Sequence, residues 1–290
     1  MIYQVVHTTR YRYQKTVSQC LSEARITPRA FPGQRVFQSR IEVIPEPALF
    51  DVRTDYFGNE VATFSVFRSH DLFSVCATST VEVEPSVEGP STNLSWEDAR
   101  TMVDKHLDAK SLEAYEFRFD SPFVQSSSAL REYGAPTFTP GRSLVATVRE
   151  LAHRIHEEFS YSPKSTSIDM PLPEILKGRK GVCQDFAHVM IGVLRSFSLS
   201  ARYVSGYLRS GAKYVGVEAS HAWVSVYIPG YGWLDLDPTN DLLPGEGHVT
   251  VAWGRDFGDV TPVKGVSLGG GGQTVEVEVK VLPLALAEAT

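Results

Sequence analysis

The sequence predicts an α+β fold, with an all-β, sandwich-like N-terminal domain followed by a domain of helices and an adjacent sheet. Three observations support this prediction. Residues 1–86 read as β-rich runs separated by turn signals. Residues 143–159 repeat apolar side chains at helical spacing, which indicates an amphipathic helix. The same spacing in residues 183–197 predicts a second helix, and three strand-like runs follow it.

Length and composition limit the classes of protein that need to be considered. A chain of 290 residues can form one large or two medium domains, and 42% hydrophobic and 21% charged residues are ordinary for a globular protein. The net charge of −6 argues against nucleic acid as the main partner. The chain has no apolar run of membrane-spanning length and no signal-peptide pattern at its start, so we expect a cytoplasmic protein without a membrane partner.

The three cysteines, Cys20, Cys76 and Cys183, are widely spaced and form no CxxC pair. This spacing predicts neither a disulfide framework nor a zinc site. We therefore expect no metal and no cofactor. We expect Cys20 and Cys76 to be buried, unreactive thiols, whereas a free reactive thiol at Cys183 would survive in a reducing cytoplasm.

The N-terminal domain is expected over residues 1–86. Residues 57–60 read as a hairpin turn, and residues 81–84 alternate apolar and acidic side chains as a half-exposed strand does. Nothing in this part groups histidines, cysteines or carboxylates, so we expect a structural or substrate-positioning role. Residues 87–94 are rich in chain-breaking residues and form the expected linker. The second domain would then span residues 95–290 and end in a C-terminal strand extension.

The expected helices of the second domain begin with a short one for which Ser95 is the candidate N-cap. Residues 110–142 have an irregular pattern and support no prediction. A long amphipathic helix follows Ser143, and His153 and His156 lie three residues apart on it. Because no third ligand is evident, we expect these histidines at the surface or the rim of the protein and not in a metal site.

Cys183 begins the helix predicted over residues 183–197. The unpaired N–H groups and the positive dipole end at a helix N-terminus favour a thiolate there, and Gly181 allows a close approach by a substrate. A lone cysteine in this position is usually a buried structural thiol. A histidine and an aspartate on the strands expected at residues 201–208, 220–228 and 233–237 favour a catalytic interpretation instead.

His221 is the favoured base for Cys183. Alternate residues of its strand form a core face, and His221 lies on the other, mixed face, which suits a cleft. His188 is the competing histidine and lies five residues after Cys183 on the same helix. It points about 140° away from the thiol, so a helix-surface or second-layer role is expected for it.

Two aspartates, Asp235 and Asp237, could orient His221. His221 and Asp237 share a face of the sheet if Tyr227 lies opposite Trp233, which makes them diagonal neighbours with backbones about 7 to 8 Å apart. We therefore predict a hairpin with an odd-length loop or a bulge. Asp237 is favoured because the strand ends beside it and leaves its carboxylate at the end of the sheet. Asp235 is the alternative.

Several ordered motifs carry a family resemblance, and they are Gly-Val-Cys-Gln-Asp-Phe-Ala-His (181–188), Ala-Arg-Tyr-Val-Ser-Gly-Tyr-Leu (201–208), His-Ala-Trp-Val-Ser-Val-Tyr (221–227) and Gly-Trp-Leu-Asp-Leu-Asp-Pro-Thr (232–239). They resemble the core of the bacterial transglutaminase-like family. The opening of the chain, with Tyr3, His7 and Tyr11, resembles the β-rich module attached to many such cores. The resemblance spans nearly the whole chain.

The resemblance implies a papain-related α+β core with Cys183, His221 and Asp237 as the catalytic triad. The expected chemistry is acyl transfer at an amide bond of a peptide or protein, through a thioester, with hydrolysis favoured because water is abundant. The backbone N–H of Cys183 can donate to the oxyanion, Gln184 is a candidate second donor, and Trp223 is a candidate cleft residue.

Alternatives remain open at this point. Glutamine transamidation uses the same triad, as do other acyltransferases such as an arylamine acetyltransferase or a peptide N-glycanase. A non-catalytic binding module is a third class. Animal cross-linking enzymes carry tryptophan where this chain has Gln184, and no calcium-ligand cluster is apparent, so calcium-activated cross-linking is not expected.

Overall fold

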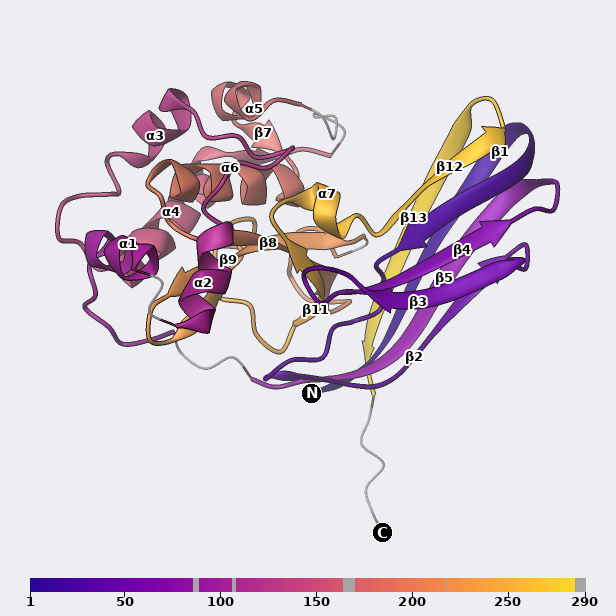
Figure 1. Cartoon of the computed structure of the whole chain (residues 1–290), viewed down its shortest axis with the longest axis horizontal. Coiled ribbons are helices and arrows are strands. Elements are labelled where there is room, and N and C mark those ends of the chain that lie inside the picture. Colours follow the sequence, from indigo (N-terminus) through magenta and orange to yellow (C-terminus); the bar gives the residue numbers. More distant parts are fainter. Residues whose placement is uncertain (86–88, 106–107, 164–169, 218, 285–290) are drawn as a thin grey trace, which may run out of the picture.

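The computed structural model describes residues 1–85, 89–105, 108–163, 170–217 and 219–284. A β-rich layer lies beside a second part in which helices surround a smaller sheet (Figure 1). The predicted α+β class is confirmed. Within the described ranges, no helix is both long enough and apolar enough to cross a membrane.

An antiparallel sheet of seven strands forms the β-rich layer. Its main path runs in the order β2 (Gln34–Ile44), β5 (His70–Val83), β1 (Ile2–Ala24), β4 (Glu60–Val66) and β3 (Leu49–Thr54). β1 pairs with β5 over its first half and with β4 at its end, and its register shifts between Arg12 and Val17. Apolar residues of β1, β4 and β5 then enclose a separate small core, in which the rings of Phe64 and Phe73 lie 6.0 Å apart.

The last two strands of the chain also belong to this sheet. β12 (Val263–Gly269) pairs with Val17–Ala24 of β1, and β13 (Gln273–Pro283) pairs with Tyr3–Tyr13. The yellow end of the chain thus lies beside its indigo start (Figure 1). We expected these strands to extend the second domain, and the structure places them instead in the sheet of the β-rich layer. β5 and β4 each pair with one edge of β1, so the opposite edge of each half is free to pair with β13 and β12. Residues 87 and 88 of the expected linker lie outside the described residues.

The second part is built on an antiparallel sheet in the order β10 (Gly232–Leu236), β9 (His221–Ile228), β8 (Ala201–Leu208) and β11 (His248–Gly254). Its helices are α1 (Trp96–Asp104), α2 (Ala109–Glu116), α3 (Ser128–Gly134), α4 (Leu144–Glu158), α5 (Leu172–Gly178), α6 (Cys183–Ser196) and α7 (Phe257–Val260). The short strands β6 (Ser160–Tyr161) and β7 (Lys180–Gly181) pair just before α6. The helices predicted after Ser95 and Ser143 are α1 and α4, and Ser95 caps α1.

The start of α6 is fixed by its own sequence. The Asp185 carboxylate accepts a hydrogen bond of 2.8 Å from the backbone N–H of Val182, which would otherwise be unpaired at the helix end. A Cβ at residue 181 would lie 2.5 Å from this carboxylate, so the position requires Gly181. Together these residues hold Cys183 at the first position of the helix.

Two buried amides attach the β-rich layer to the second part. The Gln34 side chain accepts from the Thr250 N–H at 2.8 Å and donates to the Thr250 carbonyl at 2.7 Å. Asn59 does the same with Trp253, at 3.0 Å and 2.8 Å. Both partners lie on β11, so the side chains replace a strand neighbour along that edge. These bonds set the position of the β-rich layer relative to the smaller sheet.

Candidate active site

Cys183 lies in a cleft of about 570 Å³ between the two parts of the molecule. Its side chain is 8% exposed, whereas Ala187, one turn further along α6, is fully buried. Tyr161, Gln184 and His221 line the same cleft. The thiol at the start of α6 therefore has an opening to the surface, and the imidazole expected beside it lies in the same space.

The β9–β10 hairpin has the predicted register. Trp233 lies opposite Tyr227, and an odd-length loop, residues 229–231, connects the two strands. His221 is the first residue of β9, and Asp237 follows the end of β10. Their side chains meet, with His221 Nε2 donating to Asp237 Oδ2 at 2.8 Å. The parity of the strands thus brings these two predicted site residues together.

The Asp237 carboxylate is fully buried and surrounded by donors. Oδ1 accepts the backbone N–H groups of Thr239 and Asn240, and Oδ2 accepts from His221, His248 and the Asn240 amide. Burial alone would raise the pKa of Asp237, but the charges and hydrogen bonds of His221 and His248 hold it well below the usual range for aspartate. Asp237 is therefore an anion at neutral pH.

Burial and the neighbouring Asp237 and Cys183 have opposite effects on the pKa of His221. Burial lowers its pKa, but the charges of Asp237 and Cys183, with the hydrogen bond to Asp237, raise it to about 10. Because Nε2 is bonded to Asp237, Nδ1 is the nitrogen left for the thiol, and no well-aligned hydrogen bond reaches it from the described residues. A Cβ on Gly216, which has φ of 92°, would lie 3.0 Å from Nδ1. Glycine keeps this side of the ring open.

Tyr161 was not predicted from the sequence as part of the site. Burial and the charge of Cys183 raise its pKa to about 12, so its hydroxyl stays protonated. A Cβ on Gly216 would lie 3.5 Å from this hydroxyl, and the same Cβ would lie 3.0 Å from His221 Nδ1. Tyr161 thus places an uncharged donor close to the Cys183–His221 pair. The short β6–β7 pairing that positions it has too few residues to give a sequence signal.

His248 is the second residue that the sequence did not reveal. It begins β11, is 4% exposed, and its Nε2 donates to Asp237 Oδ2 at 3.2 Å. Its ring lies edge-on to Trp223, with the ring centres 5.4 Å apart. β11 pairs with β8 and not with the strands next to Asp237, so no local spacing connected His248 to the site.

Three other predicted candidates have distinct positions. Asp235 accepts from Trp223 Nε1 at 3.2 Å and from the Ser225 hydroxyl, and these partners differ from those of Asp237. Trp223 is fully buried with its N–H bonded to Asp235, so the structure does not place it in the cleft. Its face of β9 is covered by neighbouring side chains, with the His221 ring centre 6.3 Å away. Gln184 is half-buried and lines the cleft as expected.

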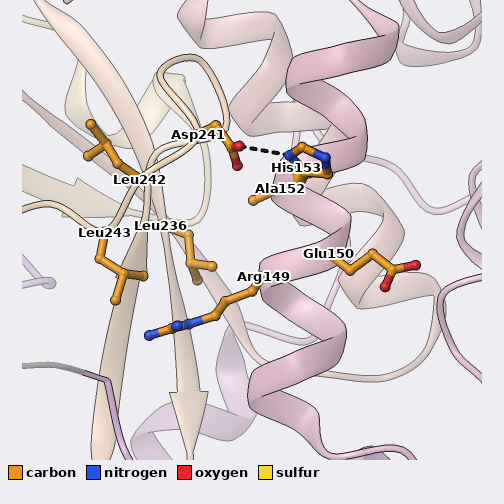
Figure 2. Close-up of a pocket in the computed structure, with 8 residues that line it drawn as sticks. All are labelled: Arg149, Glu150, Ala152, His153, Leu236, Asp241, Leu242 and Leu243. Carbon is orange, nitrogen blue, oxygen red and sulfur yellow. Dashed lines mark hydrogen bonds and ion pairs between the residues drawn. The ribbon is translucent and has the colours of Figure 1, made fainter.

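The remaining histidines named in the sequence make other contacts. His188 is buried and accepts the Phe257 N–H at 3.2 Å, so it occupies the second layer and not the helix surface. His153 is exposed and hydrogen-bonds Asp241 at 2.7 Å, beside a cavity of about 520 Å³ (Figure 2). His156 is half-buried. Within the part of the chain that the structure describes, no three His, Cys, Asp or Glu side chains are grouped to hold a metal ion.

The cavity in Figure 2 lies between α4 and residues 236–243. Leucine side chains, Arg149 and the His153–Asp241 pair line it. Neither Cys183 nor His221 is among its lining residues. The cleft at Cys183 is therefore the better candidate for chemistry.

Known proteins are similar to this chain over almost all of its length. Residues 3–82 match the model of the bacterial transglutaminase-like N-terminal region, and residues 132–238 match that of the transglutaminase-like superfamily. An uncharacterized protein from Mycobacterium tuberculosis is 37% identical over 295 residues, covering 97% of this chain and 92% of that protein. One from Mycobacterium leprae is 33% identical over 288 residues, covering 97% and 99%.

Two further matches concern named proteins. A protein-glutamine gamma-glutamyltransferase from Pseudomonas aeruginosa is 36% identical over 108 residues, which are 34% of this chain and 16% of that enzyme. A solved structure from Cytophaga hutchinsonii, of a protein proposed to be a cysteine protease, has a TM-score of 0.75 at 22% identity and covers 99% of this chain and 92% of that one. The latter match shows a shared fold.

Family models therefore match both parts of the chain in order, and relatives more than 30% identical extend over almost its entire length. The chain belongs to the bacterial transglutaminase-like family.

Proposed function

We propose that this protein is an enzyme that transfers the acyl group of an amide or peptide bond to Cys183 and then to water. The observation that carries the proposal is the buried His221–Asp237 hydrogen bond of 2.8 Å beside a thiol at a helix start. A base whose protonated form is stabilised in this way suits removal of the thiol proton.

The first step is attack by the Cys183 sulfur on the amide carbon. His221 Nδ1 receives the thiol proton, and Asp237 stabilises the imidazolium that forms. Negative charge then develops on the carbonyl oxygen. The backbone N–H of Cys183, at the first position of α6, can donate to this oxyanion. The Tyr161 hydroxyl and the Gln184 amide are the candidate second donors, since both line the cleft.

Collapse of the tetrahedral intermediate completes the transfer. His221 gives its Nδ1 proton to the departing amine, and the acyl group remains on Cys183 as a thioester. Water then attacks the thioester, with His221 taking one of its protons, and the products are a carboxylic acid and the free thiol. Asp237 keeps Nε2 protonated throughout, so that Nδ1 alternates between base and acid.

The acceptor can be water or an amine. Among the described residues that line the cleft, no aspartate or glutamate offers a counter-charge to a lysine ammonium group, which favours water. Transamidation is the second candidate, because the partial match in Pseudomonas aeruginosa is named a protein-glutamine gamma-glutamyltransferase.

The test is a synthetic peptide library incubated with the protein, with and without a fluorescent primary amine, and read by mass spectrometry. New chain ends or deamidated side chains indicate hydrolysis, and amine-labelled glutamines indicate transamidation. Cys183→Ala should give neither product and keep nearly the wild-type Tm. Product formation by that variant would exclude Cys183 as the nucleophile.

A binding module without catalysis predicts a different result. The folded wild-type protein would then form no product, and iodoacetamide near neutral pH would alkylate Cys183 no faster than the buried Cys20. We expect Cys183 to react much faster than Cys20, which serves as an internal control in the same chain.

A further inference from the structure

One wall of the Cys183 cleft comes from the β-rich layer. Thr9 and Tyr11 of β1 lie opposite Val277 and Val275 of β13, and all four residues line the cleft. Odd-numbered residues of both strands share this face because side chains alternate along a strand. The C-terminal strands therefore complete the space in which the proposed reaction occurs.

The valines of β13 form a continuous apolar row. Val281 and Val279 are buried, at 0% and 4% exposure, in the core between the two parts. Val277 and Val275 continue the same face but are 43% and 48% exposed where they reach the cleft. Apolar side chains left open beside a reactive thiol offer a binding surface for a substrate side chain.

The described residues that line the cleft also carry no formal charge apart from that of the reactive pair. Of the described residues that line it, none is Asp, Glu, Lys or Arg. His7 is hydrogen-bonded to Thr9 at 2.9 Å, and burial lowers the pKa of His7 to about 4, so it is uncharged at neutral pH. The charged residues of β13, such as Glu276 and Glu278, lie on its opposite face. A charged substrate group would lose water here without gaining a partner.

The edge of β13 gives a reason to expect a peptide. Among the described strands β13 pairs only with β1. On its other edge Val281 exchanges hydrogen bonds with Ser210, so the unpaired N–H and C=O groups of that edge are those nearer the cleft, at Val275 and Val277. β13 also contacts β8, which carries cleft residues Tyr203 and Ser205. β13 lies on the side of the β-rich layer that faces the helices (Figure 1). An extended peptide can add to such an edge as a further strand while its side chains meet the valines.

We infer, on the basis of the proposed function, that the acyl donor is an extended peptide with an uncharged, apolar side chain beside the reacting amide, packed on Val275 and Val277. A hydrophobic subsite discriminates by roughly tenfold to a few hundredfold for small changes in the apolar group. The wild-type protein should therefore process peptides with leucine or phenylalanine next to the reacting amide at least tenfold faster than peptides with aspartate or lysine there.

Val277→Asp tests this subsite directly. The variant should lower kcat/KM at least tenfold for peptides with leucine beside the reacting amide and raise it for those with lysine. Leu282→Asp is the matched control, because Leu282 lies on the opposite face of the same strand and is 45% exposed. It should leave both rates within twofold. Val275→Asp is a second variant in case Val277→Asp folds poorly, as judged by circular dichroism.

The outcomes distinguish failure of the apolar subsite from failure of the proposed function. Products that depend on Cys183 but show no preference for apolar neighbours would overturn the subsite and leave the proposed function standing. Equal effects of the Val277 and Leu282 variants would do the same. Absence of any product that depends on Cys183 would overturn the proposed function, and the subsite with it.

Discussion

Replacing Asp237 by asparagine tests the centre of the site, since the side chain keeps its shape and loses its charge. Asp237 Oδ1 accepts the backbone N–H groups of Thr239 and Asn240, and an asparagine oxygen can still accept them. Oδ2 accepts from His221 at 2.8 Å, from the Asn240 amide at 2.8 Å and from His248 at 3.2 Å. The NH₂ group of asparagine in that place is itself a donor and cannot accept any of these three hydrogen bonds.

The size of the effect follows from those three hydrogen bonds. A hydrogen bond to a charged group contributes about 1.5–3 kcal/mol, and His221 can regain one bond by switching tautomer so that Nε2 accepts. The net loss is then about 3–8 kcal/mol, or a fall in Tm of roughly 6–30 °C. The switched tautomer carries its proton on Nδ1, which must receive the thiol proton. We therefore expect kcat/KM to fall by roughly 10³–10⁴-fold.

The assay measures kcat/KM on a peptide selected from the library and Tm by circular dichroism. Asp235→Asn is the matched control, because Asp235 lies two residues before Asp237, on β10, but bonds Trp223 and Ser225 instead of His221. It should lose stability and keep kcat/KM within tenfold. A D237N protein that keeps kcat/KM within tenfold, or a D235N protein as inactive as D237N, would refute this account of the site.

Three further predictions concern pH and the shell of the site. The pKa of His221 rises from 6.5 to about 10 on folding, so its stabilisation is complete below pH 6.5 and is lost as pH increases toward 10. Tm should therefore decrease over that range, and a constant Tm would contradict the shift. His248→Gln keeps a hydrogen-bond donor for Asp237 and should retain kcat/KM within tenfold. His248→Leu removes the donor and should lower kcat with KM unchanged. Equal losses in the two variants would exclude hydrogen bonding as the role of His248. Gly206→Ala would put a Cβ 2.3 Å from the Val249 carbonyl oxygen, so urea unfolding should show a loss of about 3 kcal/mol, and an unchanged midpoint would disprove the clash.

Local periodicity predicted the parts of the fold that depend on neighbouring residues. The register of Tyr227 opposite Trp233 followed from parity, since a slip of one residue would move His221 and Asp237 to opposite faces. The amphipathic pattern after Ser143 located α4. A C-terminal strand was also expected from the sequence, but the pattern of a strand does not identify the strand beside it, so the pairing of β13 with β1 could not be predicted.

The sequence likewise predicted the site residues that lie in local motifs, and not those that depend on the packing of distant segments. Cys183, His221 and Asp237 lie in ordered motifs. In the structure Cys183 and His221 line one cleft, and the buried Asp237 is hydrogen-bonded to His221. Trp223 lies on the same face of β9 as His221, yet its indole is buried and bonded to Asp235. Alternation along a strand predicts which side chains share a face, but not which other residues cover that face. The position of His248 beside Asp237 depends on the order of strands in the sheet, and the spacing of residues along the chain does not predict that order. The cytoplasmic location stays a prediction.

The return of the C-terminal strands to β1 has a consequence for how the polypeptide is made. At about 5–20 residues per second, the ribosome needs roughly 10 to 50 seconds to proceed from Ala24 to Val263. During that interval one edge of an already synthesised strand has no native partner, and an open edge of this kind readily pairs with other chains. Newly made protein should therefore depend on chaperones or on a low rate of synthesis more than its compact finished form suggests, and removal of residues 263–283 should make that exposure permanent.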